Sequence, residues 1–331
     1  MIKNLLSKSH KRIIVIIIAF LVSAFIWYVN ASWGNTLRIL VIASILVFLT
    51  VYAPFEIYFT FRDIWFDRWD VLYLKNLETT KVKINVDGAN LYADLIKSKD
   101  NEAVYSKNTI IVVSSGFSDK KETLQYYYYP LAYQGYVILA YDARGIGESK
   151  KTGHRADFLR RIEDFESIIG WITVNEELKN FKINALGISI GAITVLCAGF
   201  PNEKIEKIVA VSSMSHYKQS ISAANLIVKF SYFMKGVDLS PDEDVDQKIS
   251  PYIVIERLKN TLSQAEWKRF SEQVLLIHSK NDKIIPYINF EENISILELP
   301  DEKQLILRKG GHMQKKNELA LVGATLKFFN S

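Results

Sequence analysis

Residues 183–199 of the chain read INALGISIGAITVLCAG. The run 183–186 is apolar except for Asn184 and predicts a buried strand, and 192–199 has the composition of a buried helix. Between them, Gly187 and Gly191 flank Ser189 at a spacing of two residues. A strand that turns this sharply into a helix has room only for small residues beside the serine, and it lifts the hydroxyl toward the positive end of the helix dipole. We therefore predict that Ser189 is a nucleophile.

A serine hydroxyl attacks well only when a histidine removes its proton and a carboxylate orients that histidine. In this strand-turn-helix context the order along the chain is serine, acid, histidine. Three histidines follow Ser189, and His312 comes directly after the last predicted strand, behind two glycines that allow a sharp turn. We predict His312 as the base, although a loop histidine without a role is the alternative. His278 ends an apolar strand and is interpreted as structural, and His216 stands at the entrance of a long insertion.

Asp282 is the predicted acid, because it lies just beyond the strand 274–278, at the sheet edge where Ser189 is expected. Asp301, beside Pro300, is typical of a turn. The other competing acids lie in a polar insertion, where a solvated loop explains them: Asp238, Asp242, Asp244 and Asp246.

An oxyanion formed during attack needs backbone donors, normally the N–H after the nucleophile and one from the loop after the third strand. Ile190 and Phe117 are the candidates, and Gly116 would permit the close approach. A plain strand-ending turn is the alternative for the segment 114–117.

The segment 142–149 reads DARGIGES and is rich in glycine, but it lacks the lysine of a phosphate loop and a full dinucleotide fingerprint. We predict an internal ion pair between Asp142 and Arg144 that supports the loops around the site.

The four tyrosines 126–129 are interpreted as core and surface residues. Cys197 is expected to be buried and inert. No cluster has metal-ligand spacing, so neither a metal nor a cofactor is expected.

Short apolar runs alternate with helical patterns from residue 81 onward, which predicts an α/β fold with a mostly parallel sheet covered on both faces. The eight predicted strands are 81–86, 91–96, 109–114, 136–141, 183–186, 205–211, 274–278 and 304–307, the first two forming an antiparallel hairpin at Asp87-Gly88. The predicted helices are 121–133, 156–174, 192–199, 287–296 and 319–329. The insertion 213–272, with amphipathic patterns at 221–234 and 253–262, falls where a lid would.

The first 60 residues are interpreted as a membrane anchor. Residues 13–29 and 39–55 each lack a charge over 17 positions, and we predict transmembrane helices at about 13–31 and 38–58. A secretory signal peptide fits less well, because a second apolar run follows at once. A connector is expected over 61–80 and a hydrolase domain over 81–331.

Charge sets the predicted orientation. Four basic residues precede the first span, namely Lys3, Lys8, Lys11 and Arg12, and the loop 30–36 is uncharged, so the positive-inside rule places the N-terminus and everything after about Arg62 in the cytoplasm. A single cysteine agrees with a reducing compartment. Residues 1–60 carry +4 of the net +5, which argues against a nucleic-acid partner.

Together, the segment 142–149, the Ser189 turn, the Asp282 segment and Gly311-His312 resemble the α/β-hydrolase superfamily, in the branch of monoacylglycerol lipases, serine aminopeptidase-like proteins, dienelactone hydrolases and their membrane-anchored relatives. The resemblance covers about 81–331. It implies an eight-stranded sheet with one antiparallel pair, a cap after the sixth strand, and hydrolysis of an ester, thioester or amide through an acyl-enzyme. The family often has His-Gly where this chain has Ser115-Gly116.

These expectations converge on a membrane-anchored serine hydrolase whose partners are a small acyl substrate, lipids included, and the bilayer. A peptidase or acyltransferase would use the same three residues and stays open. A non-catalytic membrane scaffold is the third alternative, for which an incomplete triad would be the signature.

Overall fold

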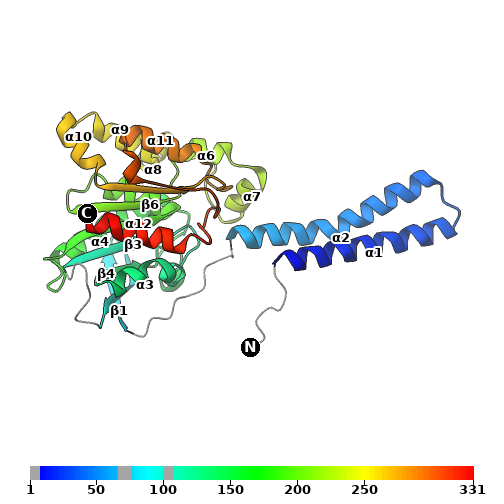
Figure 1. The fold of residues 1–331 in the computed structure, drawn as a ribbon, viewed down its shortest axis with the longest axis horizontal. Helices are drawn as coiled ribbons and strands as arrows, with labels where there is room; N and C mark the ends of the chain where they lie inside the picture. Colours follow the sequence, from blue (N-terminus) through cyan, green and yellow to red (C-terminus); the bar gives the residue numbers. More distant parts are fainter. Residues whose placement is uncertain (1–7, 66–75, 100–107) are drawn as a thin grey trace. The chain divides into compact units, whose positions relative to one another are not determined.

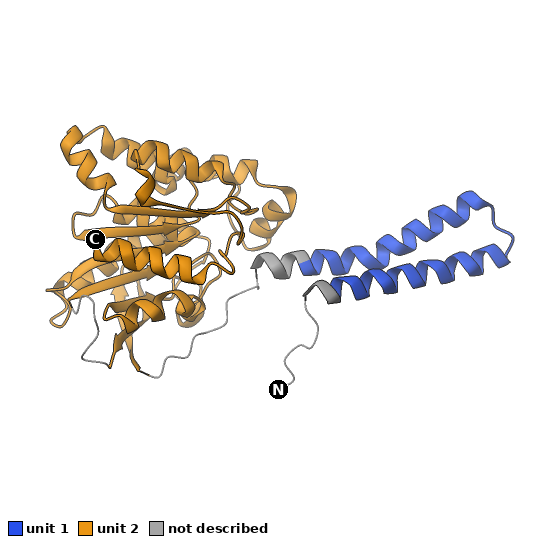
Figure 2. Ribbon diagram, viewed as in Figure 1, with its two compact units in different colours: residues 1–67 blue, residues 68–331 orange. Residues whose placement is uncertain are grey.

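The computed structural model describes residues 8–65, 76–99 and 108–331. The chain divides into two compact units, residues 1–67 and 68–331, and each is considered by itself (Figure 2). Of the predicted connector 61–80, residues 66–75 lie outside the described residues, as does Lys3 of the basic N-terminus.

The first unit is a hairpin of two helices, α1 (Lys8–Ser32) and α2 (Leu37–Trp65). The turn between them contains Gly34 in the left-handed region, at a φ of 74°. Ser23 Oγ donates to the carbonyl oxygen of Ser44 across the two helices at 2.7 Å. Within these helices, stretches of 22 and 23 residues are apolar and long enough to cross a bilayer. They extend beyond the predicted spans 13–31 and 38–58 at both ends.

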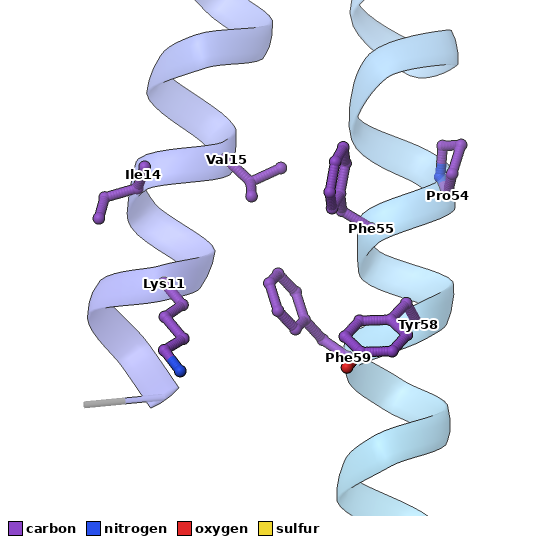
Figure 3. A pocket seen from close by; sticks show the side chains of 7 residues that line it. All are labelled: Lys11, Ile14, Val15, Pro54, Phe55, Tyr58 and Phe59. Atoms are coloured by element: carbon purple, nitrogen blue, oxygen red, sulfur yellow. The ribbon is translucent and has the colours of Figure 1, made fainter. Parts of the chain in front are cut away.

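The same hairpin holds an apolar groove of about 480 Å³ between its helices (Figure 3). Val15 of α1 faces Phe55 and Phe59 of α2, and Lys11 lies at the end where α1 begins. An ion pair between Arg12 and Glu56, 3.5 Å apart, joins the helices near this end.

The second unit contains one sheet of eight strands in the order β1-β2-β4-β3-β5-β6-β7-β8 (Figure 1). Only β2 runs against its neighbours, and the pairs from β4 to β8 are parallel. The strands are β1 (Leu77–Val86), β2 (Ala89–Ser98), β3 (Thr109–Ser114), β4 (Val137–Tyr141), β5 (Lys182–Ile188), β6 (Ile205–Val211), β7 (Val274–Ser279) and β8 (Gln304–Leu307). The predicted α/β fold is thus confirmed. The predicted hairpin is longer than expected, because pairing of β1 continues along Leu77–Thr80, where most side chains are polar or exposed and give no apolar signal.

Helices cover both faces of this sheet. One face packs against α3 (Gln125–Tyr133) and α12 (Glu318–Asn330), with Tyr127 and Phe328 in a core that includes Ile138 of β4. The other face packs against α5 (Ile190–Thr194), which continues as a π-helical turn over Val195–Gly199, and this helix contacts α4 (Phe158–Val174). Because β3 and β4 are covered on both sides, every residue in them is buried, which is why they appear as continuous apolar runs in the sequence.

The tyrosine run 126–129 contributes mainly to the core. Tyr126, Tyr127 and Tyr128 are buried. Tyr127 and Thr325 of α12 share a hydrogen bond of 2.6 Å between their hydroxyls, and the Tyr128 hydroxyl donates to the carbonyl oxygen of Lys121 at 2.8 Å. Polar ends of otherwise buried rings are therefore satisfied inside the protein.

The insertion 213–272 is helical, and we call it the cap insert. Its helices are α6 (Tyr217–Ala223), α7 (Leu226–Met234), α8 (Glu243–Ile249), α9 (Pro251–Lys259) and α10 (Gln264–Ser271). The prediction of one helix over 221–234 is wrong, because the Asn225 side chain accepts from the N–H of Val228 and begins a new helix. The short, polar helices α8 and α10 were not predicted, since each offers only two large apolar side chains to signal a helix. Helix α11 (Ile288–Leu297), which follows β7, contacts α9 of the cap insert.

Candidate active site

The turn after β5 holds Ser189 in a strained conformation, with φ 58° and ψ −119°. This left-handed backbone is costly for a residue with a side chain, and such strain gathers at functional sites. A Cβ atom on Gly187 would collide with the carbonyl oxygen of Gly191, and one on Gly191 would collide with that of Ser114. The two glycines are therefore required sterically, and the turn leaves the serine at the start of α5.

The structure brings Ser189, His312 and Asp282 together. His312 Nε2 lies 2.9 Å from Ser189 Oγ, and His312 Nδ1 lies 2.8 Å from Asp282 Oδ2. The carboxylate can only accept, so Nδ1 carries the proton that it donates to Asp282, and Nε2 is left to accept from the serine hydroxyl. This is the arrangement in which an imidazole can remove the serine proton.

Asp282 is held as an ionised carboxylate. Its side chain is fully buried, and Oδ1 accepts from the N–H groups of Ile284 and Ile285 at 2.9 and 3.0 Å. Burial alone would raise the pKa of this carboxyl, but the charge and hydrogen bond of His312, with smaller contributions from His278 and the Ile285 N–H, outweigh it and hold the pKa below its usual value. A charged partner for His312 is therefore present at neutral pH.

The loop that carries His312 is fixed by three side chains that the sequence did not single out. Gln314 Nε2 donates to Ser212 Oγ at 2.6 Å, and Ser212 Oγ lies 3.4 Å from the carbonyl oxygen of His312. Asn281 Oδ1 accepts from the N–H of Gly311 at 2.9 Å. Ser212 follows β6 with a φ of 53°, and this position at the carboxyl edge of a central strand is the one sequence signal that could have drawn attention to it.

The other two histidines after Ser189 do not contact its hydroxyl, and His278 Nε2 lies 3.8 Å from Asp282 Oδ2. His278 is buried, with Nε2 3.0 Å from the carbonyl oxygen of Ile285, and burial lowers its pKa, so it is neutral and structural. His216 stacks on Tyr252 at 4.4 Å and lies 3.6 Å from Glu292.

Among the competing acids, Asp246 accepts from the Lys218 N–H and the Ser250 hydroxyl inside the cap insert. Asp301 begins a short 3-10 turn. The surroundings of Asp246 and Asp301 thus account for both residues without a role in the active site.

Phe117 and Ile190 stand where oxyanion donors are expected, one after β3 and the other as the first residue of α5. Arg161 of α4 is buried beneath this loop and donates to the carbonyl oxygens of Gly116 and Phe117 at 3.5 and 3.3 Å. Burial lowers the pKa of this guanidinium to about 10, so it remains charged. In a trans peptide the N–H points away from the C=O, so a cation bound to the Gly116 carbonyl directs the Phe117 N–H to the opposite side. Arg161 was not predicted, because nothing in the sequence of α4 shows that its side chain is buried.

The predicted ion pair between Asp142 and Arg144 is wrong. Asp142 instead accepts from the N–H groups of Lys121 and Glu148, both at 2.8 Å, and pairs with Lys121 Nζ at 3.2 Å. Arg144 pairs with Asp164 of α4 through two nitrogens, each 2.8 Å from a carboxylate oxygen. Asp142 therefore fixes the loop 142–149 to Lys121, and Arg144 fixes it separately to Asp164 of α4.

Lys121 is a second buried cation that was not predicted. Its ammonium also contacts Glu148, and this hydrogen bond, followed by that of Lys81, lowers the pKa of Glu148 to about 2. The loop around residues 142–149 is thereby tied to the segment before α3. Cys197 is buried as expected, and burial raises the pKa of its thiol.

A family model described as serine aminopeptidase, S33, matches residues 105–241. The chain has the α/β-hydrolase fold. Its fold is shared with the acylaminoacyl peptidase of Pyrococcus horikoshii, at a TM-score of 0.55 and 17% identity over 78% of this chain and 42% of that one. An esterase of Pyrococcus furiosus matches at a TM-score of 0.52 and 16% identity over 80% and 95% of the two chains.

Further matches were found among solved structures and curated proteins. The 2,6-dihydroxy-pseudo-oxynicotine hydrolase aligns at a TM-score of 0.59 and 12% identity over 99% of this chain and 89% of that one. Among curated proteins, the uncharacterized protein YcjY of Escherichia coli (strain K12) is 31% identical over 107 residues, 32% of this chain and 35% of that protein. An uncharacterized 31.7 kDa protein of Escherichia coli, from the traX-finO intergenic region, is 22% identical over 57% of this chain and 65% of that one. The chain thus spans less than two thirds of the length of these curated relatives.

Proposed function

We propose that this α/β-hydrolase is a membrane-anchored serine hydrolase that cleaves an acyl ester or a related thioester. The observation that carries the proposal is the pair of contacts made by His312, 2.9 Å to Ser189 Oγ and 2.8 Å to Asp282 Oδ2. The family model and the esterase and peptidase neighbours support hydrolysis as the reaction class.

The proposed reaction has two halves. Ser189 Oγ attacks the acyl carbonyl while His312 Nε2 takes its proton, and the same proton passes to the leaving alcohol or thiol as the carbonyl–heteroatom bond breaks. Water then attacks the acyl-enzyme while His312 takes a proton from it. The bond between the acyl carbon and Ser189 Oγ breaks, His312 returns the proton to Oγ, and the carboxylic acid leaves. Asp282 remains ionised throughout and stabilises the imidazolium.

Negative charge builds on the carbonyl oxygen in both halves. We assign its stabilisation to the N–H groups of Phe117 and Ile190, with Arg161 positioning the first of them. Ile190 opens α5, where the N–H groups of the first turn have no partner within the helix and the dipole favours an anion.

The membrane part of the proposal is supported by α1 and α2, whose apolar stretches of 22 and 23 residues suit a bilayer core of about 30 Å. The positive-inside rule favours a cytoplasmic N-terminus and hydrolase unit. A fusion of alkaline phosphatase to the C-terminus tests this orientation. Phosphatase activity in intact cells would mean that the hydrolase unit faces the opposite side.

A peptidase is the second candidate, because the matching family model is described as serine aminopeptidase and one neighbour is an acylaminoacyl peptidase. An acyltransferase would differ only in the group that accepts the acyl chain. The complete set Ser189, Asp282 and His312 argues against a non-catalytic scaffold. Hydrolysis rates for a series of p-nitrophenyl esters and aminoacyl amides distinguish an esterase from a peptidase. We expect the esters to be the better substrates.

The nucleophile is tested by Ser189→Ala, with Ser271→Ala of α10 as the matched control, since Ser271 is also buried and only donates to the Lys268 carbonyl. We expect Ser189→Ala to abolish ester hydrolysis and Ser271→Ala to retain it. If Ser189→Ala retained as much ester hydrolysis as Ser271→Ala, Ser189 would not be the nucleophile.

A further inference from the structure

Helix α7 of the cap insert has two different faces. Val228, Ser231 and Tyr232 are buried against the hydrolase unit. The opposite face exposes five large apolar side chains, with exposed fractions of 82% for Leu226, 50% for Ile227, 57% for Phe230, 65% for Phe233 and 62% for Met234. The side that should be polar in a surface helix is thus the more apolar one.

Helix geometry shows how concentrated this surface is. At about 100° per residue, the five exposed side chains fall within an arc of about 120° that contains no polar residue. Among the described residues of the unit 68–331, eleven large apolar side chains are exposed, and five of them belong to this nine-residue helix. Scattered apolar residues are normal on a protein surface, whereas a continuous cluster marks an interaction site. We call these five residues the α7 apolar face.

We propose that the α7 apolar face inserts into the surface of the lipid bilayer that holds α1 and α2. This inference rests on the membrane anchoring in the proposed function. The chain continues from the end of α2 at Trp65 to the start of β1 at Leu77 in 11 residues, so the unit that carries α7 is covalently tethered to that bilayer. Such tethering makes a modest intrinsic affinity sufficient. Lys229 borders the apolar arc, as basic residues do in helices that lie in a membrane interface.

The buried side of α7 rests on the loop that we assign to the oxyanion. The Tyr232 ring meets the Phe117 ring edge-on at 6.3 Å, and Lys235 Nζ donates to Ser118 Oγ at 3.2 Å. With the outer face in lipid, the bilayer surface lies about one helix diameter, 10–12 Å, from this loop. An apolar acyl ester then moves only a short distance from the bilayer to Ser189. Docking of α7 therefore points to an ester dissolved in the membrane as the substrate class.

The experiment uses the full chain in phosphatidylcholine vesicles with an environment-sensitive fluorophore on one introduced cysteine. Cys197→Ala removes the native thiol. The probes stand at Phe230→Cys and Phe233→Cys on α7, at Phe20→Cys in α1, and at Val174→Cys, which ends α4 and is a matched control because Val174 is 72% exposed. Vesicles with and without doxyl-labelled lipid report contact of each probe with acyl chains.

We expect doxyl lipid to remove most of the emission of the probes at 230, 233 and 20 and to leave the probe at 174 nearly unchanged. If the probe at 20 is quenched but both α7 probes behave like the one at 174, docking is wrong while anchoring stands. An unquenched probe at 20 would overturn the anchoring and the docking together. A shift at 230 that depends on protein concentration and not on doxyl lipid would assign the face to a second copy of the chain and contradict the lipid assignment.

Discussion

Two loops at the carboxyl edge of the sheet deliver the proposed nucleophile and base, and they are fixed by different forces. The turn after β5 is determined by sterics, because a Cβ atom on Gly187 would meet the Gly191 carbonyl and one on Gly191 would meet the Ser114 carbonyl of β3. The loop after β8 is held by long-range hydrogen bonds, from Asn281 to Gly311 and from Gln314 to Ser212. Ser189 is thus placed by the exclusion of side chains at two glycines, whereas His312 is placed by the polar side chains of Asn281, Ser212 and Gln314. We therefore expect substitutions to disturb the first loop by steric collision and the second loop by loss of a hydrogen bond.

The largest effect is expected from Gly191→Ala. The new Cβ would meet the Ser114 carbonyl, so the turn or β3 must move, at a cost of about 3 kcal/mol in stability and with loss of activity. Gly170→Ala in α4 is the control, because a Cβ there meets nothing within 4 Å and alanine favours a helix by about 0.5–1 kcal/mol. Thermal unfolding and ester hydrolysis measure both. An active, stable Gly191→Ala would show that the turn is not held by sterics.

Asp282→Asn should come next, lowering kcat roughly 10⁴-fold, since the amide can favour the wrong tautomer of His312 while the geometry is kept. Steady-state kinetics on a p-nitrophenyl ester give the value. A kcat within a few-fold of the wild type would exclude Asp282 as the partner of His312.

The same variant tests the electrostatics of Asp282. Because the native pKa lies below the unfolded value of about 3.9, its stabilisation is complete above that pH and is lost as the pH falls through the native pKa. The difference in unfolding midpoint between wild type and Asp282→Asn should therefore shrink between pH 6 and pH 3. A difference that grows as the pH falls would contradict the sign of the shift.

Arg161→Met should lower kcat by roughly 10- to 100-fold with little change in KM, because misdirecting one oxyanion donor costs less than removing it. Methionine keeps much of the apolar packing against Phe158, whose ring lies 6.0 Å from the guanidinium. A lower unfolding midpoint with unchanged kcat would reduce Arg161 to a structural role. Partial recovery of kcat in Arg161→Lys would support positioning.

The smallest effect is expected from Gln314→Ala, which frees one side of the His312 loop and should lower kcat roughly 10-fold. Gln304→Ala is the matched control. Gln304 is the first residue of β8, and its side chain donates to the Leu299 carbonyl instead of to the His312 loop. Equal kcat values in the two variants would mean that the hydrogen bond to Ser212 does not hold the base.

The sequence predicted what depends on local pattern. The strands β3, β6 and β8 have the predicted bounds. In β3, burial on both faces leaves an almost unbroken apolar run, and in β6 and β8 a short apolar run remains recognisable between polar neighbours. The meeting of Ser189, Asp282 and His312 followed from their order and from the strand ends that precede them. Their catalytic roles remain predictions.

Tertiary partners could not be predicted. Asp142 and Arg144 are close in sequence and opposite in charge, yet Lys121 and Asp164 are their partners, since direction of a side chain in a loop depends on what surrounds it. Arg161 looks like an ordinary helix surface residue until α4 is packed. The break between α6 and α7 depends on the Asn225 cap, which competes with a continuous apolar pattern.

Ser189 is the residue that we expect to become acylated, and locating a covalent adduct on the protein tests this assignment. The full-length protein is treated with a fluorophosphonate, digested, and analysed by mass spectrometry. We expect a single phosphonylated peptide containing Ser189, and no adduct in Ser189→Ala. Undiminished labelling of Ser189→Ala, or an adduct on another serine in the wild type, would contradict it.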